Sequence, residues 1–152
     1  MVDEILNEVA DRCDRYRLDG YHCSEATLRV CADMLNLDLP EVLFKVSSGF
    51  RGGGGGYGER CGVVESGIIL ISYLYGRTAP TENITGYSYL VRTLHDRFLA
   101  ELGSYTCRIL KPFAQHISPD RSCSYVYKKG SMVVAKLLME SDSLLAELKS
   151  DE

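Results

Sequence analysis

The sequence predicts an all-α fold: a single-domain bundle of several helices, with a glycine-rich loop before a central apolar helix. Apolar residues recur three and four positions apart along most of the chain, which is the spacing of one helix face. No stretch alternates apolar and polar residues cleanly, and no hairpin turn such as Asn-Gly joins two β-branched runs. The length of 152 residues fits one domain, residues 1–152, without an interdomain linker.

Three helices are expected before residue 50. Residues 2–17 carry an apolar stripe with charged residues on the opposite face, and Gly20 closes this helix or lies just beyond its end. A second helix is expected from about Cys23 to Asn36. Asp38 is a candidate cap for a short third helix, in which Pro40 suits the first turn.

Seven glycines fall between residues 49 and 58, so this tract cannot be the interior of a helix or a strand. A long apolar helix follows from Cys61 to Tyr75 and ends at Gly76. Its most apolar part, residues 67–75, is too short to cross a bilayer. This part is a candidate for the core or for a subunit interface, and a homodimer is the simplest closed oligomer.

Two further helices are expected in the second half of the chain. One passes through Tyr87 and stops at Gly103. A short turn at residues 106–110 leads to Pro112, and the last helix runs from about Asp120 to Glu140 with Gly130 weakening its middle. The tail at residues 142–152 is expected to be flexible, with at most one more short helix.

The charge of the chain disfavours two classes of partner. Lys and Arg number 17 against 21 Asp and Glu, for a formal net charge of −4. Nucleic acid is not expected as a partner, because phosphate binding requires a basic face. Membrane insertion is not expected either, and the acidic start is unlike a secretory signal, so the predicted location is the cytoplasm. Thiols stay reduced there, so the six cysteines indicate metal or redox chemistry more than disulfides.

Cys61 stands where the glycine-rich tract meets the start of a helix. The unpaired N–H groups at a helix start stabilise a thiolate and lower the pKa of the thiol. Glycines let the backbone approach closely, and their N–H groups can donate to sulfur or to an anion. Cys61 is therefore a candidate catalytic nucleophile or ligand, and Gly53, Gly54, Gly55 and Gly62 are candidate cofactor-binding residues. The alternative is a flexible surface loop followed by a buried cysteine.

Three more cysteines, Cys23, Cys107 and Cys123, lie at predicted helix starts or turns, where thiolates can converge on a common point. Cys13 and Cys31 lie on apolar stripes and are expected to be small core residues. No CxxC pair occurs, which is unlike a structural zinc site or a thioredoxin-like centre. Four scattered cysteines that the fold assembles could still ligate an iron–sulfur cluster.

Five short segments occur in a distinctive order: Tyr21-His-Cys23-Ser-Glu-Ala, Ser48-Gly-Phe-x-Gly-Gly-Gly, Cys61-Gly62, Cys107-Arg-x-Leu and Cys123. This order resembles the C_GCAxxG_C_C family of redox-active proteins over about residues 16–140. The resemblance implies an all-helical fold of similar length with four characteristic cysteines. By position these are Cys23, Cys61, Cys107 and Cys123, which become the expected metal ligands. A similar module in some multihaem cytochromes implies that they hold an iron–sulfur cluster.

The chain departs from the family pattern after Cys61. Val63 and Ser66 replace smaller residues, so altered packing is expected around this helix start. Glu65 is unusual in so apolar a helix, and it is expected to face a polar cavity, to pair with Arg60 or Arg92, or to reach solvent. His22 precedes Cys23 and is either a ligand or proton donor, or a partly exposed turn histidine.

Three hypotheses for the function follow from these residues. The first is electron transfer through an iron–sulfur cluster on the four cysteines, with an unknown redox partner. The second is a thiol/disulfide redox protein with Cys61 as nucleophile, or a carrier or sensor of a soft metal, since soft cations prefer thiolate ligands. The third is a structural helical module with inert cysteines.

Overall fold

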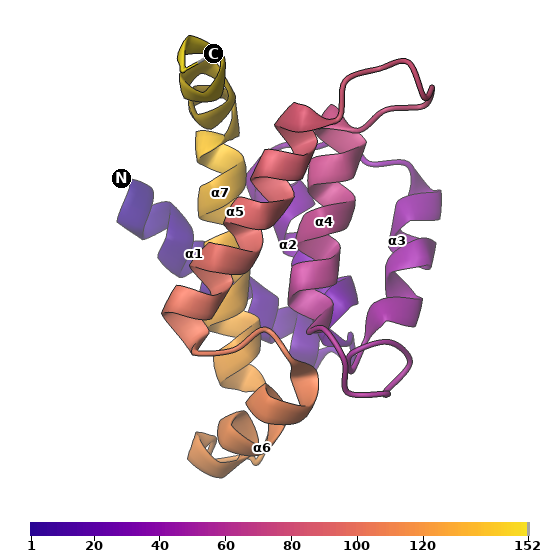
Figure 1. Cartoon of the computed structure of the whole chain (residues 1–152). Helices are drawn as coiled ribbons and strands as arrows, with labels where there is room; N and C mark the ends of the chain where they lie inside the picture. Colours follow the sequence, from indigo (N-terminus) through magenta and orange to yellow (C-terminus); the bar gives the residue numbers. More distant parts are fainter. Residues whose placement is uncertain (152) are drawn as a thin grey trace.

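A computed structural model describes residues 1–151 and confirms the all-α fold (Figure 1). Within this range the elements follow in the order α1 (Val2–Leu18), α2 (Cys23–Met34), α3 (Glu41–Ser47), the 3-10 turn η1 (Ser48–Phe50), α4 (Gly62–Tyr75), α5 (Thr85–Leu102), α6 (Cys107–Ile117) and α7 (Ser124–Ser150). The β-structure of these residues consists of one isolated bridge, between Arg60 and Thr106. No helix in this part of the chain has both the length and the apolarity to cross a membrane.

The core lies where α4 and α7 cross the other helices. α7 packs against α1, α2, α4, α5 and α6, and α4 packs against α2, α3, α5 and α7. The largest fully buried side chains include Phe98, Leu28, Leu70, Leu94 and Leu137. Burying a side chain of this size contributes roughly 1.5–3 kcal/mol. These side chains form the hydrophobic core of the bundle.

The sequence predicts that Gly130 weakens the middle of the last helix. In the structure this glycine also lets α7 approach its neighbours closely. A Cβ atom at this position would lie 2.9 Å from Cγ1 of Val63 in α4 and 3.0 Å from Cε2 of Phe98 in α5. Gly67 has the same role in α4, where a Cβ would lie 2.6 Å from Cδ2 of Leu94. These two glycines set how closely α4, α5 and α7 pack.

Two segments are more helical than the sequence predicts. Residues 107–117 form α6 where a turn is expected, because Leu110 and Ala114 lie one helical turn apart and are buried together, while Pro112 stays exposed. α7 continues through the tail expected to be flexible, as far as Ser150, and Leu144 and Leu145 pack against the core. The end of that predicted tail, Glu152, lies outside the described residues.

Candidate functional site

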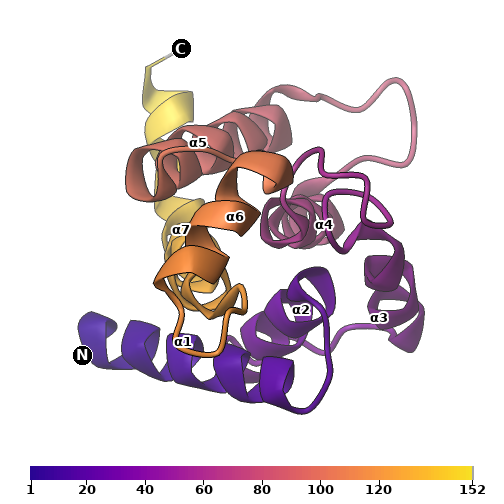
Figure 2. The same ribbon diagram turned by 90° about the horizontal axis from the view of Figure 1, so that it is seen from below.

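The N-termini of four helices carry one cysteine each. Cys23 and Cys107 are the first residues of α2 and α6, and Cys61 and Cys123 immediately precede α4 and α7. All four side chains line a single cavity of about 250 Å³. Figure 2 looks onto the end of the bundle where α6 and the glycine-rich loop lie. The fold therefore brings together the four cysteines that the sequence singles out.

The bridge between Arg60 and Thr106 holds Cys61 and Cys107 in register. The Cys61 N–H donates to the Tyr105 carbonyl at 2.8 Å, and the Cys107 N–H donates to the Glu59 carbonyl at 2.6 Å. The glycine-rich loop and the start of α6 are thus fixed to each other through the backbone. This pairing places two cysteines that are far apart in the sequence on the same cavity.

Gly53 and Gly62 allow the backbone to lie against the cysteine side chains. A Cβ at Gly62 would lie 2.6 Å from Cys23 Sγ, and a Cβ at Gly53 would lie 2.8 Å from Cys107 Cβ. Gly53 also has a φ of +74°, which strains any other residue. Neither glycine lines the cavity itself, so their contribution is to the packing of the thiols.

Gly54 and Gly55, the other two glycines predicted to bind a cofactor, are exposed. Their N–H groups donate to the carbonyls of Phe50 and Gly49, inside the loop. Gly52 instead lines the cavity, and its N–H donates toward the Cys23 thiol. The sequence could not distinguish Gly52 from its neighbours, because a run of glycines carries no pattern of its own.

Burial raises the pKa of the Cys61 thiol well above its usual value, and the neighbouring Cys23 raises it further. The N–H groups of Val63 and Val64, at the start of α4, lower this pKa by less. The lowered pKa expected at this helix start is therefore wrong. Cys61 is only 4% exposed, so the loss of hydration exceeds the effect of the helix N-terminus.

The other three cavity cysteines are more accessible but also have raised thiol pKa values. Burial is the largest cause for Cys23, Cys107 and Cys123. Lys111 and Arg108 act in the opposite direction on the pKa of Cys107. At neutral pH these thiols are therefore protonated more fully than a free cysteine.

The remaining cysteines lie in the core, as the sequence predicts. Cys13 and Cys31 are fully buried, and neither lines the cavity. Burial raises the pKa of Cys13 to about 12, and the nearby hydroxyls of Ser131 and Thr27 act in the opposite direction. Cys13 and Cys31 are therefore separate from the four cysteines that share the cavity.

Positive side chains surround the cavity. Arg17, Arg51 and Lys111 line it, and no Asp or Glu is found among its lining residues within the described chain. Arg17 is held by Asp14 at 2.7 Å and by Asp120 at 3.1 Å. For residues 1–151 the ion pairs involve neither Arg51 nor Lys111. The cavity is therefore suited to groups that carry negative charge.

Glu65 pairs with Arg60, one of the roles expected for it. The Arg60 Nε donates to Glu65 at 2.6 Å, and another Arg60 nitrogen donates to His95 Nε2 at 2.8 Å. His95 Nδ1 in turn donates to the Val91 carbonyl. This network anchors the residue before Cys61 to α4 and α5. The sequence gives no reason to connect His95 with Arg60, because they come from separate elements.

Ser66 and His22 both hold the start of a helix. Ser66 is fully buried, and its hydroxyl donates to the Ser24 carbonyl, which ties α4 to the first turn of α2. The His22 backbone N–H donates to Glu25 at 3.0 Å, and its side chain lies at the edge of the cavity. The sequence also misses Tyr127, a buried cavity residue whose hydroxyl donates to the Tyr21 carbonyl at 3.3 Å.

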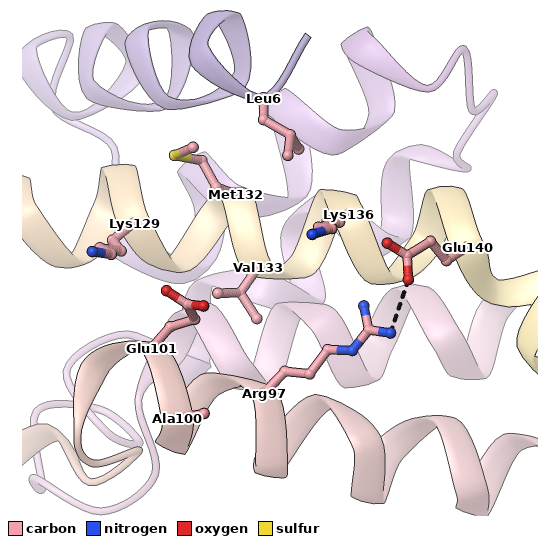
Figure 3. A pocket seen from close by; sticks show the side chains of 9 residues that line it. All are labelled: Leu6, Arg97, Ala100, Glu101, Lys129, Met132, Val133, Lys136 and Glu140. Atoms are coloured by element: carbon pink, nitrogen blue, oxygen red, sulfur yellow. Dashed lines mark hydrogen bonds and ion pairs between the residues drawn. The ribbon is translucent and has the colours of Figure 1, made fainter. Parts of the chain in front are cut away.

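A second cavity, of about 390 Å³, lies between α1, α5 and α7 (Figure 3). Met132 and Val133 line it together with charged side chains, of which Arg97 and Glu140 pair at 2.8 Å. No cysteine or histidine lines it among the residues described. The thiol chemistry of the chain is therefore confined to the first cavity and to the two core cysteines.

In residues 1–151, no three His, Cys, Asp or Glu side chains are already arranged to hold a metal ion. A comparison with protein families gives one match, over residues 21–137, to the family described as "putative redox-active protein (C_GCAxxG_C_C)". The matched range includes all four cavity cysteines. Searches of curated proteins and of solved structures give no significant match. The extent of the family match shows that the chain belongs to the C_GCAxxG_C_C family of redox-active proteins.

Proposed function

We propose that this protein transfers electrons through an iron–sulfur cluster held by Cys23, Cys61, Cys107 and Cys123. The proposal rests on one observation: four thiols, each from the start of a different helix, line one cavity. Four cysteine thiolates are the usual ligands of such clusters. When bound, a cluster supplies reversible one-electron transfer.

The size of the cavity supports a cluster over a single ion. The ligands of one zinc ion must all lie about 2.3 Å from one point. Here the cysteines are four of the residues that line a space of about 250 Å³, and no trio of possible ligands in the described chain is arranged around an ion. A cluster distributes its cysteine ligands over more than one iron, so its ligands can stand further apart.

The backbone around the thiols suits sulfur that carries negative charge. N–H groups of Gly52, Ser24 and Gly62 donate toward Cys23, and those of Val63 and Val64 donate toward Cys61. Hydrogen bonds to sulfur, net charge and solvent exposure set the reduction potential of a cluster. Together with the nearby cations, these donors favour thiolates once a metal has displaced the thiol protons.

The raised thiol pKa values weigh against thiol/disulfide exchange as the main activity. Exchange requires a thiolate, and redox-active thiols usually have a lowered pKa. Burial instead raises the pKa of all four cavity cysteines. A cluster does not need a low thiol pKa in the free protein, because the metal removes the protons when it binds.

Anaerobic reconstitution with iron and sulfide tests the proposal. The wild-type protein should become brown and hold iron and sulfide in a fixed ratio to the chain. Cys61→Ala should lose this colour and metal, and Cys31→Ala, a change of the same kind in the core, should retain both. Circular dichroism checks that each variant is folded. A colourless wild-type protein whose four cavity thiols are labelled freely after reconstitution contradicts the cluster.

A further inference from the structure

α6 carries an apolar stripe that faces solvent. Ile109, Phe113 and Ile117 are 61%, 51% and 44% exposed, and each follows the previous one by four residues. This spacing places them on one side of the helix. Leu110 and Ala114 bury the adjacent side. Contiguous apolar side chains on the surface of a protein mark a contact site for another molecule.

The stripe lies in the most basic part of the chain. Residues 105–130 contain one acid, Asp120, and five cations, for a net charge of +4, whereas the whole chain has −4. Of these cations, Arg108 pairs with Glu59 at 2.7 Å, outside the segment. The Phe113 ring packs edge-on against Tyr125 with the centroids 5.9 Å apart, and Lys129 Nζ lies 5.8 Å from the centre of the Tyr125 ring. Apolar and positive groups are thus contiguous on this surface.

The same helix borders the thiol cavity. α6 begins at Cys107, and its residues Leu110 and Lys111 line the cavity. In both views α6 lies at the outside of the bundle, and α7 is the helix it packs against (Figures 1 and 2). A protein seated on α6 would therefore stand directly beside the redox site.

We propose that the α6 surface, defined as Ile109, Phe113, Ile117 and Lys129, docks an acidic electron-carrier protein. This inference rests on the proposed function. Complementary charge speeds the encounter of such partners, and electron-transfer contacts are small and weak. A second copy of this chain does not fit, because a two-fold contact would bring the two basic surfaces against each other.

Binding measurements with two protein probes test this inference. An acidic ferredoxin and a basic cytochrome c are titrated separately against the reconstituted protein. At an ionic strength of about 0.01 M, only the ferredoxin should bind, and its affinity should fall as salt approaches about 0.15 M and shortens the screening length. Lys129→Glu should weaken binding about fivefold or more. Phe113→Ser should weaken it about tenfold.

Matched controls lie on α3, away from this surface. Val42 and Val46 are 59% and 47% exposed there, so Val42→Ser with Val46→Ser, and Lys45→Glu, should leave ferredoxin binding unchanged. Equal effects of the α3 and α6 variants overturn the inference, as does tighter binding of the cytochrome or a dimer that Phe113→Ser dissociates. Cys61→Ala, which lacks the cluster under the proposed function, should still bind ferredoxin. A protein that does not assemble a cluster can therefore be distinguished from a protein that does not bind ferredoxin.

Discussion

Gly62 shows how little space separates the backbone from the thiols. It follows Cys61 directly, and a Cβ at this position would lie 2.6 Å from Cys23 Sγ and 3.0 Å from the Phe50 carbonyl oxygen. No real Cβ contact is so short, so any larger residue must displace Cys23 or the end of η1. The glycine after Cys61 is therefore required by contact with another cysteine of the site.

We expect Gly62→Ala to destabilise the protein by about 1–3 kcal/mol, the usual cost of overpacking. It should also reduce iron incorporation, because Cys23 must move. Gly49→Ala is the matched control in the same segment, since a Cβ there meets nothing within 4 Å. Urea unfolding and iron analysis measure the two effects. Equal stability and iron content in the two variants would show that the close approach is unimportant.

The raised thiol pKa values predict how the metal-free protein responds to alkali. Burial raises the pKa of Cys13 to about 12 and that of Cys61 well above the ordinary value. Because the folded state favours the protonated thiol, it is stabilised relative to the unfolded chain at every pH below the thiol pKa of the unfolded chain, near 8.5. This stabilisation is lost as the pH rises toward the thiol pKa of the folded protein.

The free energy of unfolding should therefore fall as pH rises above about 9, by up to about 1.4 kcal/mol for each unit by which a thiol pKa is raised. Urea unfolding of metal-free protein between about pH 7 and pH 11 measures this slope. Cys61→Ala should fall less steeply than wild type over the same range. Identical slopes would mean that the Cys61 thiol has an ordinary pKa in the folded protein.

At the scale of elements, the spacing of apolar residues predicts most helices within a few positions, but it fails at two of them. Pro112 suggests a break, yet α6 continues through it, and the helix buries Leu110 and Ala114 together. The end of α7 looks too polar to pack, yet the Tyr75 hydroxyl bonds Ser141 and Asp142, which holds this part of the helix. In both segments, tertiary contacts determine that the chain is helical, and these contacts cannot be read from a single sequence.

The sequence predicts the cysteines of the candidate site but not the other residues that line the cavity. Cysteines at helix starts can be recognised because turn-forming residues such as glycine precede them, as for Cys23 and Cys61. Arg51, Lys111 and Tyr127 carry no such signal, because many similar residues occur along the chain. The thiol pKa could not be predicted either, since its direction depends on burial, which only the folded chain determines.

The crossing of α7 over α4 and α5 makes a prediction that opposes helix propensity. Alanine is favoured over glycine inside a helix by about 1 kcal/mol. Gly130→Ala should nevertheless destabilise the protein by about 1–3 kcal/mol, because the new Cβ would lie 2.9 Å from Val63 Cγ1 and 3.0 Å from Phe98 Cε2.

Gly86→Ala provides the comparison for Gly130→Ala. In α5 a Cβ at Gly86 meets only the flexible end of Leu145, at 3.2 Å, so this variant should be as stable as wild type or more so. Thermal unfolding of both variants decides the matter. A Gly130→Ala protein more stable than wild type would contradict the close crossing.

At the scale of the whole molecule, the bundle has a core that is separate from the thiol cavity. Phe98, Leu70 and Leu137 are buried between helices and do not line it. We therefore expect chelation of iron to leave the helices intact and to lower only the melting temperature, because a ligand that binds the folded state alone adds to its stability. Far-ultraviolet circular dichroism before and after chelation measures both, and loss of helix at room temperature would contradict an independent core.

Diffraction from anaerobically grown crystals at the iron absorption edge tests the central claim most directly. We predict one iron-containing site per chain, in the cavity at the starts of α2, α4, α6 and α7, in contact with the sulfur atoms of residues 23, 61, 107 and 123. An iron site that uses Cys13 or Cys31, or crystals of reconstituted protein with no iron signal in this cavity, would contradict it.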